Sequence, residues 1–372
     1  MIPSLYLHIP FCDSLCHYCD FGKVLTGTFS QEKYLDSLLI ELDSLEIPDN
    51  SLNTIYIGGG TPSALKPELL TRLLSRLHSS FPSVTEFTIE CNPESLSEEK
   101  VKIMSQYGVN RVSLGVQTFQ SSLLSSLNRK HSKEQVFQSV SLLKKHGITN
   151  INLDFIYGIH GQTLSMIKED IDTALFLKPT HLSFYSLQIE EGTVLYIKGY
   201  PSVSNETYRE QYDFISKRLH ENGFFRYEVS NFSLPGSESK HNLNYWNDGM
   251  YYACGLSASG YLPSLRYQNT RSMNHYLQHK FRYQEEPIDI YDEEFEFLML
   301  NLRKADGFTL DEFSSRFKKD FITSYQKEIE DCSPSLVIKD GRVFIKEEDL
   351  YVMDQILLKL LILPEDLRMR QK

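Results

Sequence analysis

The residues with the most distinctive chemistry are three cysteines near the start of the chain, spaced as Cys12-x3-Cys16-x2-Cys19. Three thiolates so close together form a soft donor set that suits an iron–sulfur cluster or a zinc ion. The chain has only six cysteines in 372 residues, which is too few for a disulfide framework. In a reducing compartment such a group of thiols more often binds metal than forms disulfides.

Three interpretations of this triplet are open. A [4Fe–4S] cubane would use one thiolate per iron and leave the fourth iron free, and a free coordination position is what a catalytic metal site requires. A zinc ion would complete its shell with His8 or His17 as a Cys3His site. The third interpretation is three unrelated buried thiols. The spacing alone leaves the cluster and the zinc ion nearly equal, so the surroundings of the triplet have to separate them.

The second motif is a glycine run, Gly58-Gly59-Gly60-Thr61-Pro62, which follows the β-branched and aromatic stretch 54–57. Glycines let the backbone approach a ligand closely. No Lys-Ser/Thr follows the run, which excludes a P-loop, and contiguous glycines do not match the G-x-G-x-x-G dinucleotide fingerprint. Taken alone, the run is a tight strand-to-helix turn. Beside the cysteine loop of the preceding strand, it is better interpreted as a cradle for the amino group and carboxylate of S-adenosylmethionine.

Several polar residues follow further along the chain, namely Glu90, Gln117, Arg129 and Asp154. Carboxylates can bind ribose hydroxyls, and an arginine can bind a carboxylate. Tyr18, beside the last cysteine of the triplet, is placed to cover a cluster or to stack on an adenine. A salt bridge or a cap at a strand end is the simpler explanation for any one of them. The evidence that they form a binding site is that they are expected at the same edge of the sheet.

The location of these residues follows from the fold, for which the first 220 residues predict six repeated strand–helix units. Runs rich in β-branched and aromatic residues predict strands at 5–9, 54–57, 86–90, 111–115, 151–156 and 181–187. Apolar residues at helical spacing predict helices at 33–45, 68–77, 98–107, 133–145, 164–177 and 205–221. The alternation predicts an α/β fold with a parallel sheet, either a barrel or an open doubly wound sheet. In both, chemistry lies at the carboxyl ends of the strands, where the cysteines, the glycines and most of the polar residues fall.

After about residue 222 the pattern changes. Residues 223–285 form an extension rich in aromatics and glycine, and residues 286–372 are largely helical. Helices are predicted at 292–302, 310–317 and 321–329, followed by a hairpin at 336–345 around Asp340-Gly341. We therefore divide the chain into a barrel at 1–222, the extension, and a smaller α+β, winged-helix-like domain at the C-terminus. A cap or a partner-binding module is favoured over DNA binding, because residues 285–300 are strongly acidic.

The overall charge and the apolar segments limit the partners and the location. The net charge is −11, from 49 acidic and 38 basic residues, and no basic run predicts a nucleic-acid partner. The N-terminus lacks a basic segment followed by a long apolar stretch, so we expect no secretory signal. No run of 18 apolar residues predicts a membrane-spanning helix. With the thiol triplet, these features lead us to expect a cytoplasmic protein.

Together these segments resemble the radical SAM branch that contains oxygen-independent coproporphyrinogen III oxidase and the heme chaperone HemW. The matching segments are 6–12, the cysteine spacing, 58–62, 115–119, 127–129 and 152–158. The resemblance implies an incomplete parallel (β/α)6 TIM-like barrel. It also implies that Cys12, Cys16 and Cys19 ligate the cluster. Tyr6, Gly59 and Glu90 would contact a first S-adenosylmethionine. The positions that match contacts to a second S-adenosylmethionine in the oxidase are Tyr18, Gly60, Thr61, Gln117, Arg129 and Asp154.

Two features within this branch favour the chaperone. The oxidase resembles CxxxCxxCxC, with a fourth cysteine two residues after the third, and here that position is Phe21. The segment 241–246, His-Asn-Leu-Asn-Tyr-Trp, matches the HNxxYW motif of HemW, which makes His241 a candidate heme ligand. A core-packed Tyr-Trp pair with a hydrogen-bonded histidine is the alternative. One departure is Ser259, where HemW-like chains usually carry a histidine, and Cys254 nearby either compensates for it or is incidental.

The resemblance therefore implies a heme chaperone that binds a [4Fe–4S] cluster, S-adenosylmethionine and heme and delivers heme to an acceptor hemoprotein. The alternative is oxygen-independent coproporphyrinogen III oxidase of porphyrin biosynthesis, so it stays open whether the chain is an enzyme. A structural zinc protein is least favoured. The expected partners are heme and a hemoprotein. The resemblance is also compatible with a homodimer and with peripheral membrane contact through the acceptor. The number of S-adenosylmethionine molecules stays open.

Overall fold

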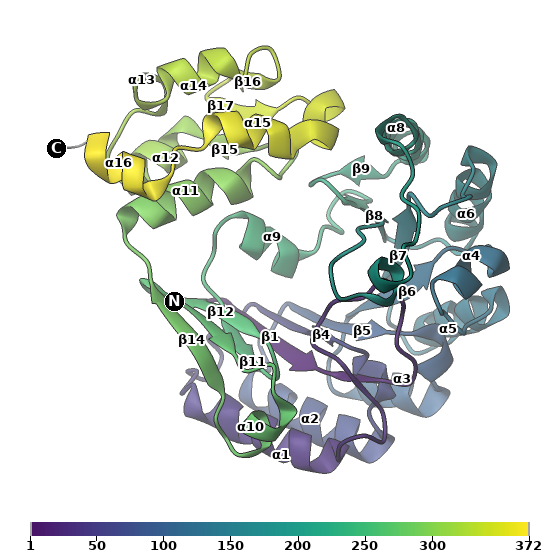
Figure 1. The fold of residues 1–372 in the computed structure, drawn as a ribbon. Helices are drawn as coiled ribbons and strands as arrows, with labels where there is room; N and C mark the ends of the chain where they lie inside the picture. The colour runs from purple at the N-terminus through teal and green to yellow at the C-terminus, as the bar shows by residue number, and fades with distance from the viewer. Residues whose placement is uncertain (1, 371–372) are drawn as a thin grey trace.

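The fold is a curved parallel sheet with helices on its outer side (Figure 1). A computed structural model describes residues 2–370. Six neighbouring parallel strands form the centre of the sheet: β1 (Ser4–Ile9), β4 (Thr54–Gly59), β5 (Glu86–Cys91), β6 (Arg111–Gln117), β7 (Asn150–Tyr157) and β8 (His181–Ser186). The main helices of these units are α1 (Gln31–Ser44), α2 (Pro67–Ser80), α3 (Glu98–Gln106), α5 (Lys133–Lys145), α6 (Leu164–Phe176) and α8 (Asn205–His220). All six predicted strands and helices are present, which confirms the incomplete (β/α)6 barrel.

Short elements fill the loops between these units. They are β2 (Phe11–Cys12), β3 (Val24–Leu25), η1 (Pro62–Ala64), η2 (Pro93–Ser95), α4 (Ser121–Ser126) and α7 (Val194–Ile197). β2 and β3 pair in parallel and frame the segment that carries the cysteines. No helix among residues 2–370 is both long enough and apolar enough to cross a membrane.

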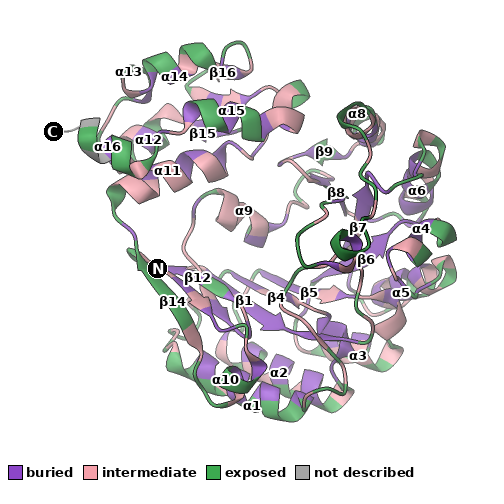
Figure 2. Ribbon diagram, viewed as in Figure 1, coloured by how far each residue is buried: buried purple, intermediate pink, exposed green. Residues whose placement is uncertain are grey.

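The six central strands have an apolar face and a polar face. Side chains alternate along a strand, so every second residue points to the same side of the sheet. The apolar set, such as Leu5, Leu7 and Ile9 on β1, is fully buried against the helices. Figure 2 shows this buried layer between the exposed outer sides of the helices and the interior. The opposite face carries these residues: Ser4, Tyr6, His8, Thr54, Tyr56, Thr88, Glu90, Ser113, Asn152, Asp154, Ser183 and Tyr185.

This polar interior is unusual, because bulky branched residues normally fill a barrel of this kind. Here the side chains bond to one another instead. Asn152 Nδ2 donates to Ser113 Oγ (2.7 Å), Asp154 Oδ1 (2.8 Å) and Ser183 Oγ (2.9 Å). Asn152 Oδ1 lies 2.7 Å from His181 Nδ1. Burying so many polar groups is tolerated only where they are hydrogen-bonded, and it prepares the barrel for a polar ligand.

Residues 223–285 contribute strands to both edges of the barrel sheet. β11 (Tyr252–Cys254) pairs in parallel with β1, and β10 (Asn231–Ser233) pairs antiparallel with β8 and with β9 (Phe225–Arg226). Between them, α9 (Lys240–Trp246) lies against the start of β4. The segment ends in a small antiparallel sheet of β12 (Ser259–Leu262), β13 (Leu265–Asn269) and β14 (Arg282–Pro287), with α10 (Met273–Leu277) before the last strand. The extension thus shares the sheet of the barrel, and the boundary at residue 222 stays a prediction.

The C-terminal residues form the expected smaller α+β unit, separate from the barrel in Figure 1. Its helices are α11 (Ile290–Asn301), α12 (Leu310–Phe317), α13 (Phe321–Ser324), α14 (Gln326–Asp331), η3 (Glu347–Val352), α15 (Met353–Leu360) and α16 (Pro364–Arg370). Its sheet pairs β15 (Phe308–Thr309) with β17 (Arg342–Ile345), and β17 with β16 (Leu336–Lys339). The predicted hairpin is present, and both turn residues have positive φ, 51° at Asp340 and 75° at Gly341, as a tight hairpin turn requires.

One buried carboxylate ties the extension to the barrel. Glu41 on α1 accepts hydrogen bonds from Gly255 N (2.9 Å), Asn269 Nδ2 (2.6 Å) and Tyr276 Oη (2.6 Å), and its Oε1 lies 3.0 Å from Arg282 Nη1. Both oxygens are used, and the side chain is completely buried.

Replacing this carboxylate by an amide is expected to destabilise the fold. In Glu41→Gln, one acceptor oxygen becomes a donor that faces other donors, so we expect the free energy of unfolding to fall by about 1–3 kcal/mol. Urea denaturation of the two proteins measures the difference. Glu32→Gln, an exposed position on the same helix, should stay within about 0.5 kcal/mol. Equal losses at both positions would contradict a specific role for Glu41.

Candidate functional site

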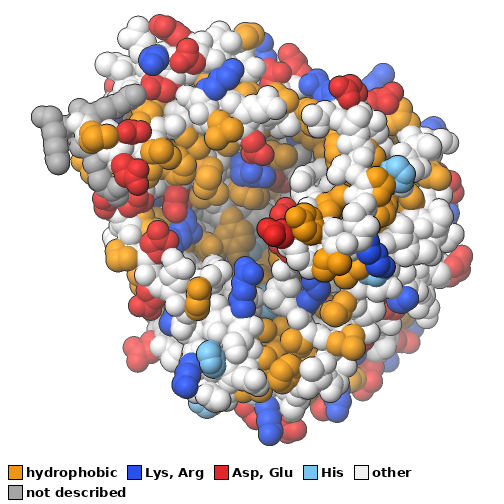
Figure 3. All heavy atoms as spheres, in the orientation of Figure 1, with side chains coloured by type: hydrophobic (Ala, Val, Ile, Leu, Met, Phe, Trp, Pro, Cys, Tyr) orange, Lys and Arg blue, Asp and Glu red, His pale blue; other side chains and the backbone are white. Residues whose placement is uncertain are grey.

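The carboxyl ends of the central strands enclose a cavity of about 530 Å³. Its walls come from the loops after β1, β4, β5, β6 and β8 and from the inner face of β7. Eleven of the thirteen predicted site residues line it: Cys12, Cys16, Tyr18, Cys19, Gly59, Gly60, Thr61, Glu90, Gln117, Arg129 and Asp154. The hollow visible between the barrel and the C-terminal helices in the space-filling view (Figure 3) is a different feature, because every residue that lines the cavity lies between Cys12 and Glu190. Residues more than 140 positions apart in the sequence therefore meet at one site.

The cysteine loop is held in place from both sides. His8 Nε2 on β1 lies 2.6 Å from the Gly22 carbonyl oxygen, and Asn128 Nδ2 donates to the Leu15 carbonyl oxygen (2.7 Å). All three cysteines are free thiols. Burial raises the pKa of the Cys12 thiol to about 11, so an uncharged thiol is favoured until a metal displaces its proton.

The arrangement of the thiols can be compared with what each metal requires. Among residues 2–370, no group of three or more Cys, His, Asp or Glu side chains is close enough to surround a single ion. A zinc ion draws its thiolates to about 2.3 Å, whereas a cubane gives each thiolate its own iron. The three thiols instead lie around a shared cavity. Three thiols around one cavity supply the donor set that a [4Fe–4S] cluster requires, with one sulfur for each of three irons.

The glycine run lies against the cysteine loop, and neither glycine at its end leaves room for a side chain. Gly59 has φ +118°, and a Cβ there would lie 2.7 Å from the His8 ring. A Cβ on Gly60 would lie 2.9 Å from Cys12 Sγ and 2.7 Å from the Pro10 carbonyl oxygen. The space beside the thiols thus depends on these two glycines. This geometry agrees with a backbone cradle for a ligand that also touches the cluster.

Two carboxylates on the polar face of the sheet, Glu90 and Asp154, line this cavity. Glu90 accepts hydrogen bonds from Tyr56 Oη (2.8 Å) and Gly59 N (3.1 Å), and burial, more than any neighbour, raises its pKa to about 7. Asp154 accepts from Ser113 Oγ (2.7 Å), and burial also raises its pKa. Glu90 can therefore take up or release a proton near neutral pH. A cationic ligand group at this carboxylate would favour its ionised form.

Arg129 lines the cavity and also contacts the cysteine loop. Its Nη1 lies 3.6 Å from Cys16 Sγ, and its Nη2 donates to the Gly115 carbonyl oxygen (2.7 Å) and to Asn92 Oδ1 (2.9 Å). Gln117 at the end of β6 has a positive φ of 65°, where a bulge interrupts the pairing with β7. Both side chains are more than nine-tenths buried. The guanidinium is thus fixed by two oxygen acceptors while it faces a thiol.

Two predicted residues, Tyr6 and His241, do not line the cavity. The Tyr6 ring stacks on Tyr56 at 6.2 Å between centroids, and its hydroxyl lies 3.1 Å from His8 Nδ1. His241 lies near the amino end of the barrel, with Nδ1 2.8 Å from Thr54 Oγ1 and Nε2 2.8 Å from Tyr245 Oη. It is fully buried, and burial lowers its pKa to about 3. The imidazole is therefore neutral, and both of its nitrogens are engaged.

Comparison with known proteins places this geometry in a family. The model of the radical SAM superfamily matches residues 6–174. The heme chaperone HemW of Lactococcus lactis is 42% identical over 355 residues, which cover 93% of each chain. HemW of Bacillus subtilis is 37% identical over 95% of each chain, and HemW of Escherichia coli is 32% identical over 81% of this chain and 82% of its own. The chain belongs to the HemW family of radical SAM proteins. This confirms the resemblance drawn from the motifs.

The HemW-family chain shares its fold with a solved oxidase. The structure of coproporphyrinogen III oxidase (HemN) from Escherichia coli, described as a radical SAM enzyme, superimposes with a TM-score of 0.82. The match covers 96% of this chain and 90% of the oxidase, at 19% sequence identity. At that identity the likeness concerns the fold, including the C-terminal unit, and carries no statement on activity.

The position that departs from the HemW pattern lies away from the cavity. Ser259 begins β12 and is exposed, and Cys254 on β11 is completely buried within the hydrophobic core. Neither lines the cavity with the cysteine triplet. Cys254 therefore has the environment of a packing residue rather than of a metal ligand.

The structure adds cavity residues that the sequence analysis missed, chiefly Tyr56, Asn92, Lys23 and Tyr185. Tyr56 lies in an apolar run, and only strict alternation with Thr54 would have placed it on the polar face. Asn92 comes directly after β5, at the same edge as the glycine run, which was a usable signal. Lys23 and Tyr185 carry no local signature, since their roles depend on how the loops fold back.

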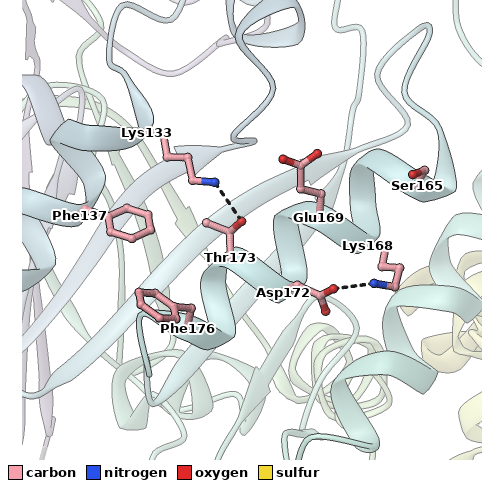
Figure 4. Close-up of a pocket in the computed structure, with 8 residues that line it drawn as sticks. All are labelled: Lys133, Phe137, Ser165, Lys168, Glu169, Asp172, Thr173 and Phe176. Carbon is pink, nitrogen blue, oxygen red and sulfur yellow. Dashed lines mark hydrogen bonds and ion pairs between the residues drawn. The ribbon is translucent and has the colours of Figure 1, made fainter.

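A second cavity, of about 490 Å³, lies on the outer surface between α5 and α6 (Figure 4). The Lys133 amine points to Thr173 Oγ1 (3.4 Å), and Lys168 pairs with Asp172 (2.7 Å). The rings of Phe137 and Phe176 stack at 6.0 Å between centroids. None of the predicted site residues belongs to it, and its charged groups are already paired or hydrogen-bonded.

Proposed function

We propose that this chain is a heme chaperone that binds a [4Fe–4S] cluster, S-adenosylmethionine and heme, and delivers heme to an acceptor hemoprotein. The observation that carries the proposal is the full-length similarity to curated heme chaperones, 42% identity over 93% of both chains in the first case. Phe21, where the oxidase has a fourth cysteine, supports it. That side chain lines the cavity and is 67% exposed.

The cluster would be held by Cys12, Cys16 and Cys19, and S-adenosylmethionine by the glycine run, Glu90 and the other polar lining residues. The chemistry that such a cluster supplies is one-electron reduction of bound S-adenosylmethionine. Pockets for one drug-sized ligand measure about 300–1,000 Å³. A cavity of about 530 Å³ that must also admit part of the cluster favours one S-adenosylmethionine over two. The same reasoning supports a heme site outside this cavity.

Heme transfer and oxidase activity can be compared directly. The anaerobically reconstituted protein, loaded with heme, is mixed with an apo-hemoprotein, and transfer is followed by the shift of the Soret band. In parallel it is incubated anaerobically with coproporphyrinogen III, a reductant and S-adenosylmethionine. We expect heme transfer and no protoporphyrinogen. Formation of protoporphyrinogen would replace the proposal by the oxidase alternative, and absence of transfer would remove the delivery step.

His241 remains the proposed axial ligand of the heme iron. Its present hydrogen bonds show which contact must break before a ring nitrogen can bind iron. Nδ1 and Nε2 are both hydrogen-bonded, so binding iron through Nε2 requires Tyr245 Oη to leave. His241→Ala is expected to weaken heme binding at least tenfold, which is about 1.4 kcal/mol. Tyr245→Phe removes the competing hydroxyl, worth about 0.5–1.5 kcal/mol, and is expected to strengthen binding up to about tenfold.

Absorbance titration with hemin measures both effects. Tyr251→Phe is the matched control, because its ring contacts Tyr245 at 4.5 Å between centroids and it removes a hydroxyl from a neighbouring tyrosine. Its affinity should equal that of the wild type. Unchanged binding in His241→Ala would remove this residue from the heme site.

The partners follow from the same proposal. The acceptor is a hemoprotein, and the C-terminal unit is the module we assign to its recognition. A homodimer and peripheral membrane contact through the acceptor remain proposals. We assign a cytoplasmic location from the thiol triplet, because a reducing compartment keeps such thiols available for iron.

A further inference from the structure

Each cysteine of the triplet is accompanied by a polar side chain, which for Cys12 and Cys16 comes from a distant part of the chain. Thr61 Oγ1 lies 3.7 Å from Cys12 Sγ, and Arg129 Nη1 lies 3.6 Å from Cys16 Sγ. Lys23 donates to the Cys19 carbonyl oxygen and also interacts with its thiol. Two of the three groups carry a positive charge. Arg129 and Thr61 are 7% and 3% exposed, so water screens neither contact effectively.

Asn92 holds two of these groups at once. Its Oδ1 accepts from Arg129 Nη2 (2.9 Å), and its Nδ2 lies 3.0 Å from Thr61 Oγ1. Its own backbone N donates to Ser63 Oγ (3.1 Å), which fixes the turn after β5. One amide group therefore bridges the side chains that face Cys12 and Cys16.

The donor groups determine the direction of the hydrogen bonds that link Arg129, Asn92 and Thr61. A guanidinium has no acceptor, so the oxygen of the Asn92 amide must face Arg129. The amide nitrogen must then face Thr61, where it donates to the hydroxyl oxygen. The Thr61 hydroxyl accepts from Asn92 Nδ2 and donates its own hydrogen to Cys12 Sγ. With the amide nitrogen rather than the amide oxygen facing it, Thr61 has no competing acceptor in Asn92, and its hydrogen stays available to the sulfur.

We propose that Asn92 is a positioning residue of the cluster site, which aligns Arg129 and Thr61 as donors to Cys16 and Cys12 and thereby raises the reduction potential of the cluster. The inference rests on the proposed ligation by Cys12, Cys16 and Cys19. Reduction adds one electron from an external reductant to the [4Fe–4S]²⁺ cluster and gives the [4Fe–4S]¹⁺ form. Donors and positive charges at the thiolate sulfurs stabilise the added negative charge.

The midpoint potential of the full-length, anaerobically reconstituted protein tests this. The titration uses dithionite and redox mediators, is followed by the EPR signal of the reduced cluster, and contains no S-adenosylmethionine, so ligand binding does not enter. Thr61→Val is expected to shift the potential to more negative values, whereas Thr61→Ser, which keeps the hydroxyl, should restore the wild-type value. Asn92→Asp should shift it at least as far as Thr61→Val, because a carboxylate cannot donate to Thr61 and adds a negative charge.

A double-mutant cycle separates alignment from a general effect of charge. If Asn92 acts through Thr61, then Thr61→Val adds no further shift in the Asn92→Asp background. Lys130→Met removes an exposed positive charge next to Arg129 and should leave the potential unchanged.

Several outcomes overturn the inference. Wild-type potentials in Thr61→Val and Asn92→Asp would exclude it, as would a full additional shift in the double mutant. Should Asn92→Asp fail to assemble a cluster, the Thr61→Val and Thr61→Ser pair decides alone. Iron and sulfide are determined first. A wild-type protein without about four of each per chain contradicts the proposed cluster, whereas normal cluster content with unchanged potentials contradicts only this inference.

Discussion

Replacing any one of Cys12, Cys16 and Cys19 by alanine is expected to abolish the iron–sulfur cluster. The three thiols lie around one cavity and come from one loop, and a cubane held by three protein ligands cannot lose one and keep a stable attachment. After anaerobic reconstitution, we expect iron and acid-labile sulfide to fall from about four of each per chain in the wild type to near zero. The visible absorbance of the cluster should disappear with them.

Cys91→Ala is the matched control. Cys91 also lines the cavity, but its thiol bonds to Ser63 and packs in the hydrophobic core. This variant should keep its full iron content and lose only a little stability. Full iron in one of the triplet variants would remove that cysteine from the ligand set, and stoichiometric zinc in the wild type would replace the cluster by a zinc site.

The affinity for S-adenosylmethionine is expected to rise steeply with pH around neutrality. Glu90 has a pKa raised to about 7 by burial, so it is largely protonated at pH 6 and ionised at pH 8. S-adenosylmethionine carries positive charge, and binding it beside the carboxylate requires the ionised form. Below the pKa each pH unit should therefore change the dissociation constant about tenfold, and above it the curve should level off. Calorimetric or equilibrium-dialysis titrations between pH 5.5 and 8.5 measure this.

Two variants test the assignment of this pH dependence. Glu90→Gln should bind weakly, and its affinity should not depend on pH in this range. Asp154→Asn should move the curve to lower pH, since the charge of Asp154 contributes to the raised pKa of Glu90. A wild-type affinity that does not change with pH would contradict the role of Glu90.

The raised pKa of Glu90 also makes the free energy of unfolding of the ligand-free protein decrease as the pH rises. The folded pKa of about 7 lies above the value of about 4.3 in the unfolded chain. The contribution of Glu90 to the free energy of unfolding is therefore fully present below pH 4 and is lost as the pH rises to 7. Glu228 has a pKa raised to about 7 by burial as well, so only the difference between wild type and Glu90→Gln isolates Glu90.

Much of the barrel could be predicted because its signals are local. The strands follow β-branched runs, and the rule that ligands bind at the carboxyl ends of parallel strands places Glu90, Gln117 and Asp154 at one edge of the sheet. The glycine run and the cysteine spacing are likewise short segments. Eleven predicted residues share one cavity for this reason.

The features that could not be predicted depend on contacts between distant segments. Nothing near Tyr252–Cys254 indicates that this short segment joins β1 as a parallel neighbour. Nothing near His241 indicates that Thr54 engages its Nδ1, whereas Tyr245 at its Nε2 is four residues away on the same helix and belongs to the hydrogen-bonded alternative named above. Asn92 is a common residue after a strand, and its importance arises only from Arg129 on one side and Thr61 on the other. Such roles are set by tertiary packing, which leaves no periodic pattern in the sequence.

The position of β11 beside β1 also has a consequence for synthesis on the ribosome. Leu7 pairs with Cys254, so two-thirds of the chain must be made before the first strand gains its outer neighbour. At about 5–20 residues per second, the interval is roughly 10–50 s. Once β4 has been made, β1 can pair on one side only until β11 follows. The barrel strands alone therefore leave β1 at the edge of the sheet, and this edge is completed only when residues 252–254 have been made.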